Sequence, residues 1–178
     1  MELARSLQDK LDAKRIVIID GGTGTEISRR GVTLHPNLSW SANANITFPD
    51  LVRDIHRDYI LAGAEVIITN TFSTSRATLA NDGLSAQTEN INMQSVSLAM
   101  DARRNCSAEE TVVIAGSLSS FEPKGHPEIP ASYEESLEDY QEQVKILAEA
   151  GVDLIVLEMF VRTVDLQAAV VAATETGL

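Results

Sequence analysis

Two acidic side chains, Asp20 and Glu158, each end a run of apolar residues, in the stretches RIVIID and DLIVLE. Such runs predict buried strands, so each carboxylate is expected where a strand ends. A carboxylate in that position is partly desolvated, which is costly unless a cation or a hydrogen-bond donor meets it. The first acid is followed directly by Gly21 and Gly22, whose backbone amides are available to a ligand. These residues therefore predict a binding site at the strand ends.

Two carboxylates that converge on one site have three chemical uses. They are an acid/base pair for glycoside hydrolysis, ligands for a hard metal ion, or a cradle for the ammonium group of a substrate. In the third use, the amides of Gly21 and Gly22 would bind a carboxylate close to the place where Asp20 holds an amine. The groups would then bind the head group of an α-amino acid. The residues by themselves leave all three uses open.

The glycines of IIDGGTGTE also raise the alternative of a phosphate-binding loop. A dinucleotide fingerprint requires G-x-G-x-x-G, and, counted from Gly22, Ile27 stands where the third glycine is needed. A Walker loop requires Gly-Lys-Ser/Thr, and no lysine occurs between Lys14 and Lys124. Both observations weaken the phosphate interpretation.

Other polar groups also follow apolar runs. Thr69, Asn70 and Thr71 stand at the end of the second run, in EVIITNT, and Ser117 ends the third, in TVVIAGS. For Ser117 a structural role is favoured, in which its hydroxyl caps the next helix or bonds to loop amides. Trp40 lies in the long connection after the first run, where it would either cover the site or anchor the loop.

The elements that must position these groups follow a repeating pattern. Four apolar runs, at 15–20, 65–70, 111–117 and 153–158, are rich in Ile and Val without polar alternation, which predicts parallel strands covered on both faces. Helices are expected at 3–13, 23–30, 49–62, 85–105, 132–150 and 163–177. The fifth should begin with a capping box, Ser132 with Glu135, and end at Gly151, while Thr163 should cap the sixth.

The pattern describes an α/β fold of four βα repeats with one extra N-terminal helix. No change in composition divides the chain, so we expect a single domain over residues 1–178. Four parallel units fit either a small doubly wound sheet or half of an eight-unit TIM-type barrel. Periodicity does not choose between these architectures, but in both of them ligands bind at the C-terminal ends of the strands.

Charge and composition narrow the functional classes. The net charge of −12 argues against nucleic acid or an anionic membrane surface as the main partner. The single cysteine, Cys106, excludes an internal disulfide and fits a reducing compartment. No signal peptide or bilayer-spanning stretch is recognised, so a cytoplasmic protein that handles small molecules is expected.

Five segments, in this order, resemble the homocysteine S-methyltransferase family: DGGTGTE, WSANA, IHRDYILAGAEVIITNTF, AGS and AGVDLIVLEMF. The similarity extends from about Lys14 to the end of the chain. It implies that the chain is the N-terminal half of a homocysteine-binding (β/α)8 barrel, rather than a doubly wound sheet. It also implies transfer of a methyl group to the homocysteine sulfur, which gives methionine. The segment LEMFVRTVDLQAAV is similar to the betaine-using branch and WSANA to the bacterial branch, so the small methyl donor stays open.

The resemblance implies a substrate-binding role for six positions. These are Asp20, Gly21, Gly22, Thr69, Thr71 and Glu158. The two acids match residues that hold the homocysteine head group, the two glycines match backbone-amide contacts, and the two threonines match positions that line the amino-acid pocket. An amino-acid cradle is also one of the uses open to these residues on their chemistry alone.

The resemblance further implies zinc as the cofactor of the complete enzyme, because metal binding deprotonates and orients a thiol. The family's zinc ligands are three cysteines from later in the barrel, and Cys106 matches none of them. We therefore expect no zinc on this chain alone and little or no activity from it.

A half-barrel would leave open strand edges, so self-association or a C-terminal half that completes the barrel is expected. The alternative is a non-catalytic module for amino-acid binding or assembly.

Overall fold

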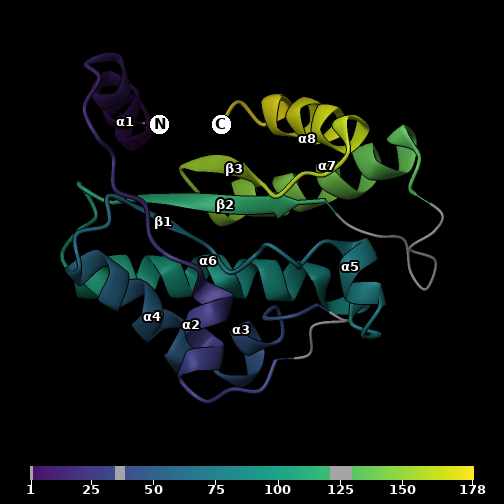
Figure 1. Cartoon of the computed structure of the whole chain (residues 1–178), viewed down its shortest axis with the longest axis horizontal. Helices are drawn as coiled ribbons and strands as arrows, with labels where there is room; N and C mark the ends of the chain where they lie inside the picture. Colours follow the sequence, from purple (N-terminus) through teal and green to yellow (C-terminus); the bar gives the residue numbers. More distant parts are fainter. Residues whose placement is uncertain (1, 35–38, 121–129) are drawn as a thin grey trace.

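The computed structural model describes residues 2–34, 39–120 and 130–178. Its centre is a parallel sheet in the order β1-β2-β3, with β1 at Val66–Ile68, β2 at Val113–Ser119 and β3 at Leu154–Glu158 (Figure 1). Neighbouring strands are consecutive in the chain, and a helix crosses between each pair, as parallel pairing requires. The α/β class and three of the four expected strands are thereby confirmed.

The first apolar run, residues 15–20, forms only an isolated bridge, in which Ile19 pairs with Val66. Ile18 accepts hydrogen bonds from the amides of Glu65 and Val66, but its side chain is 54% exposed and that of Ile16 is 87% exposed. The expectation of a fourth strand covered on both faces was therefore wrong. This segment has β1 on one side and, among the described residues, no strand on the other, so only one of its edges is held.

The six expected helices are found within a few residues of their expected positions, and two short helices, Ala44–Thr47 and Arg76–Ala80, were not expected. They are α1 (Glu2–Asp12), α2 (Thr23–Arg29), α3 (Ala44–Thr47), α4 (Pro49–Leu61), α5 (Arg76–Ala80), α6 (Thr88–Asn105), α7 (Tyr133–Ala150) and α8 (Thr163–Glu175), with a 3₁₀ turn at Ser85–Gln87. The described helices include none that is long and apolar enough to cross a membrane.

Two of the three predicted helix ends are confirmed. The Ser132 and Glu135 side chains form the reciprocal capping box at the start of α7, and Gly151 ends this helix with a φ of 94°, which favours glycine. Thr163 is not the cap of α8, so that prediction was wrong. The capping position belongs to Arg162, whose backbone is extended, and Thr163 already lies in the first turn.

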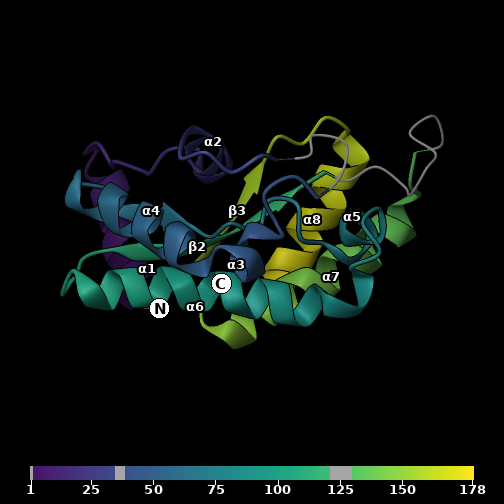
Figure 2. The same ribbon diagram turned by 90° about the horizontal axis from the view of Figure 1, so that it is seen from below.

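The two faces of the sheet are covered unequally. On one face, Ile67, Ile114 and Leu118 pack against α6, α7 and α8 in the main core. The long helices α6 and α7 run alongside the strands (Figures 1 and 2). On the other face, Val66, Val113 and Ala115 pack against Leu3 and Leu7 of α1. Every residue of β3 keeps some solvent exposure, so this strand is not covered on both faces as predicted.

Candidate functional site

A cavity of about 210 Å³ lies at the C-terminal ends of the strands. Five of the six predicted substrate-binding residues line it, namely Asp20, Gly21, Gly22, Thr69 and Glu158. Parallel strands point their carboxyl ends to one edge of a sheet, which explains why residues far apart in the sequence meet here. The sixth residue, Thr71, is fully buried and lies outside the lining of this cavity.

Asp20 is held at the cavity by the edge of β1. Its amide donates to the Val66 carbonyl at 3.0 Å, and its Oδ2 accepts from the Ile68 amide at 2.8 Å. The other oxygen, Oδ1, is buried and has no hydrogen-bond partner among the described residues. Burial raises the pKa of Asp20 from 3.8 to about 7, against the opposing effect of the Ile68 amide, and the charge of Glu158 raises it further. A cation placed at Oδ1 would relieve this cost.

Glu158 is the last residue of β3 and brings the second carboxylate to the cavity. Its Oε2 accepts a hydrogen bond of 2.5 Å from the hydroxyl of Ser117, a buried residue of β2. The structural interpretation of Ser117 as a cap or a partner of loop amides was therefore wrong. Its hydroxyl bonds to one of the two acids of the site.

The glycines of the loop allow aromatic rings to approach the backbone closely. A Cβ atom on Gly21 would lie 2.8 Å from the hydroxyl of Tyr59, and one on Gly24 would lie 2.7 Å from the ring of Trp40. Real Cβ atoms do not approach neighbours so closely, so a side chain at either position would force the neighbouring ring to shift. Two of the three glycines in IIDGGTGTE thus allow close contact with aromatic rings.

Sequence reasoning assigned no substrate-binding role to part of the cavity wall. Asn70 lines the cavity, and its side-chain amide donates to the Ser41 carbonyl and to Asn45 Oδ1, both at 2.9 Å. Trp40, for which covering the site was one of two expectations, lines the cavity and meets Phe72 edge to face, with ring centroids 6.1 Å apart. Asn70 lies between the two predicted threonines, in TNTF, so its position beside them was the available signal.

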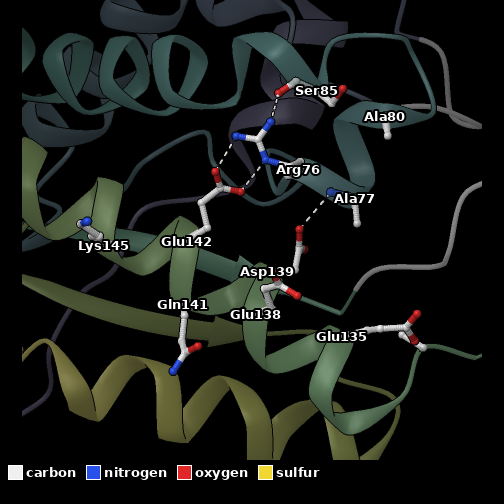
Figure 3. A pocket seen from close by; sticks show the side chains of 11 residues that line it. Arg76, Ala77, Ala80, Ser85, Glu135, Glu138, Asp139, Gln141, Glu142 and Lys145 are labelled. Atoms are coloured by element: carbon white, nitrogen blue, oxygen red, sulfur yellow. Dashed lines mark hydrogen bonds and ion pairs between the residues drawn. The ribbon is translucent and has the colours of Figure 1, made fainter.

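A second, larger cavity of about 910 Å³ lies between α5 and α7 (Figure 3). The Arg76 guanidinium there donates to Glu142 Oε2 and to the Ser85 carbonyl, both at 2.7 Å. Asp139 accepts from the Ala77 amide at 2.9 Å. Arg76 in this second cavity is therefore already paired with an acid. Asp20 and Glu158 do not line this cavity.

The residues present do not fit the zinc centre that the resemblance implies. Among the described residues, no three His, Cys, Asp or Glu side chains are grouped so as to hold a metal ion. Cys106 follows α6 and precedes β2, which places it at the N-terminal ends of the strands, away from the cavity. Burial raises the pKa of its thiol, whereas a zinc ligand must be a thiolate.

Comparison with known proteins places these observations in context. The family model described as homocysteine S-methyltransferase matches residues 17–178. The homocysteine S-methyltransferase of Escherichia coli (strain K12) is 35% identical over 165 residues, which cover 86% of this chain and 52% of that protein. Homocysteine S-methyltransferase 2 of Zea mays is 31% identical over 180 residues, which cover 91% of this chain and 53% of that protein. The chain thus spans about half the length of the curated relatives it matches.

A solved structure supports the same comparison. The metallated form of the homocysteine methyltransferase MmuM from Escherichia coli superposes with a TM-score of 0.82 at 29% identity. The match covers 98% of this chain and 63% of that one. The open sheet and its helices therefore correspond to part of the TIM barrel of that protein.

Proposed function

Because the chain belongs to the homocysteine S-methyltransferase family, we propose that it carries the amino-acid-binding part of a site where homocysteine accepts a methyl group and becomes methionine. One observation carries the proposal. Two carboxylates, Asp20 and Glu158, share a small cavity with the Gly21-Gly22 backbone, and Asp20 keeps a buried oxygen that no described residue hydrogen-bonds. A buried carboxylate that lacks a cation is suited to a ligand that brings one.

The head group of an α-amino acid matches this arrangement. Its ammonium group has three N–H donors, and the carboxylates of Asp20 and Glu158 are acceptors. Its carboxylate would meet the backbone amides of Gly21 and Gly22, which line the same cavity. The ammonium charge would favour the ionised form of Asp20. It would thus lower the pKa of this carboxyl and oppose the effect of burial.

The proposed contribution of this chain is binding and orientation of homocysteine. Zinc chemistry requires thiolate ligands that the residues present do not provide, so no methyl-transfer step is derived from them. The donor is proposed only as a small methyl-carrying molecule. A cytoplasmic location likewise stays a prediction.

The same proposal includes a polypeptide partner that covers the two edges of the sheet. Apolar side chains are exposed beside both of its edges, at Ile16 before β1 and at Val161 after β3, which is 88% exposed. A second copy of the chain or a C-terminal half of the barrel would cover them. Both remain predictions, and sedimentation of the purified chain distinguishes them, because only the first makes the chain associate by itself.

A non-catalytic amino-acid-binding module is the second candidate. The position of Cys106 at the opposite end of the strands favours it, because a thiol there cannot contribute to the cavity. Calorimetry with L-homocysteine separates the candidates. Binding that ignores added zinc supports the module, whereas zinc-dependent tight binding requires thiolate ligands that this chain, with Cys106 as its single cysteine, lacks.

The proposal is tested by the same method with L-homocysteine and L-methionine on three proteins. The wild-type chain should bind, and Asp20→Asn should bind about 10- to 100-fold more weakly, since a hydrogen bond to a charged group contributes ~1.5–3 kcal/mol. Asp139→Asn is the matched control, because it removes a part-buried carboxylate from the other cavity. Equal losses in both variants, or no binding by the wild type, would refute the proposal.

A further inference from the structure

We propose that Thr71 and Ser117 are a pair of positioning residues, whose hydroxyl groups orient the acceptor atoms of Thr69 and Glu158 toward a ligand ammonium group. The inference rests on the proposed function and concerns residues that do not themselves line the cavity. Both members of the pair are fully buried.

The hydroxyl of Thr71 has all its hydrogen-bonding capacity in use. It donates its proton to the Ser117 carbonyl at 2.9 Å and accepts from the Ser117 amide at 3.0 Å. Its oxygen also lies 2.8 Å from the hydroxyl oxygen of Thr69. A hydroxyl group has one proton to donate and two lone pairs to accept with. Because the proton of Thr71 is committed to Ser117, Thr69 must be the donor of the bond between the threonines.

This assignment decides what Thr69 offers to the cavity that it lines. Its hydroxyl proton points to Thr71, so a ligand meets only lone pairs on its oxygen. Thr69 is therefore an acceptor toward the cavity, as the carboxylates of Asp20 and Glu158 are. Three acceptors that line one cavity suit the three N–H donors of an ammonium group and oppose an anionic group or one without hydrogen-bond donors.

Ser117 performs the corresponding task for Glu158. Its hydroxyl donates to Glu158 Oε2 at 2.5 Å, which leaves the second carboxylate oxygen for a ligand. The register places Ser117 opposite Val156 and Ser119 opposite Glu158, so the hydroxyl reaches diagonally along the sheet. Without this bond, the Glu158 side chain would be free to rotate away from Asp20. The Ser117 backbone is itself fixed by Thr71, so the two acceptors are oriented by one connected set of bonds.

The first test measures ligand binding with and without the amine. Calorimetry compares L-methionine with its analogue in which hydrogen replaces the amino group. Thr71→Val and Ser117→Ala should each weaken L-methionine binding about tenfold, the effect of one lost charge-assisted hydrogen bond, and leave the analogue unchanged. A purely structural role would weaken both ligands equally, and that result would overturn the proposal.

The matched controls are buried hydroxyl groups elsewhere in the fold. Ser136→Ala removes a fully buried hydroxyl that donates to Asp165 Oδ1 at 3.0 Å. Thr88→Val removes one that donates to the Ser85 carbonyl at 2.8 Å. Both controls should lose stability as the test variants do and keep the binding of both ligands. A control that loses the amine preference would also overturn the proposal.

The second test needs no ligand and follows the Asp20 carboxyl carbon by NMR as pH is varied. Glu158 and Tyr59 are the titratable groups that interact with Asp20. Once Ser117→Ala releases the Glu158 carboxylate, its charge should raise the pKa of Asp20 less, so the Asp20 midpoint should fall, while Ser136→Ala should leave it unchanged. An unchanged midpoint in Ser117→Ala refutes the positioning role. A shifted midpoint in a chain that binds no amino acid refutes the proposed function and leaves the positioning role supported.

Discussion

Replacement of Asp20 by Asn should stabilise the ligand-free protein at neutral and alkaline pH while it weakens binding of an amine. The pKa of Asp20 is raised from 3.8 to about 7, chiefly because burial disfavours its charged form. The unfolded chain ionises this carboxyl near 3.8, so between the two values the native state holds a proton that the unfolded state has lost. The free energy of unfolding must therefore fall as pH rises through this window.

The size of the effect follows from the two pKa values. A rise from 3.8 to about 7 corresponds to about 4 kcal/mol at ~1.4 kcal/mol per pKa unit. This is an upper limit, because a carboxyl group with some solvent contact relaxes when it ionises. An Asn side chain keeps an oxygen to accept from the Ile68 amide and carries no charge, so the Asp20→Asn variant avoids the cost.

The assay is urea denaturation of the wild type and Asp20→Asn at a series of pH values from about 4 to 8.5. The difference in unfolding free energy should grow in favour of the variant as pH rises to about 7 and then level off. Asp50→Asn is the control, because that side chain is 83% exposed. A difference that stays constant over this range would refute the reasoning, as would an equal pH dependence in Asp50→Asn.

Three further predictions follow from other contacts. Binding of an amine below pH 7 should release up to one proton per ligand, because Asp20 must ionise. The affinity for the amine should therefore rise with pH up to about 7. Calorimetry in buffers of different ionisation enthalpy measures the proton release. Gly24→Ala should displace Trp40 from the cavity wall, since the added Cβ would lie 2.7 Å from its ring; an unchanged emission of this single tryptophan together with unchanged ligand affinity would contradict the packing argument. Ser132→Ala should lower stability by ~1 kcal/mol through loss of the capping box and leave amino-acid binding unaltered, as denaturation and calorimetry would show.

The position of the site was predictable because it depends on local patterns and one general rule. Asp20 and Glu158 each follow an apolar run, and parallel strands bring such ends to one edge of the sheet. The role of Thr71 was not predictable in this way. The resemblance placed it with Thr69 in the lining of the pocket, but its burial behind the wall depends on Ser117, which belongs to another strand.

The first apolar run shows a different limit of sequence reasoning. Its composition is that of a buried strand, but pairing needs neighbours, and among the described residues only β1 lies beside it. Its Ile16 and Ile18 side chains are accordingly exposed. A hydrophobic pattern reports what a segment can bury, whereas the tertiary structure decides what covers it.

The sequence by itself determined features that arise between near neighbours in the chain: six of the helices, the capping box at Ser132 and the left-handed turn at Gly151. Only the tertiary structure decided the raised pKa of Asp20 and the direction in which the hydroxyl of Ser117 donates. The physical reason is the separation along the chain over which each interaction acts. Capping and periodicity act within a few residues, whereas desolvation and hydrogen-bond direction depend on groups that distant segments bring together.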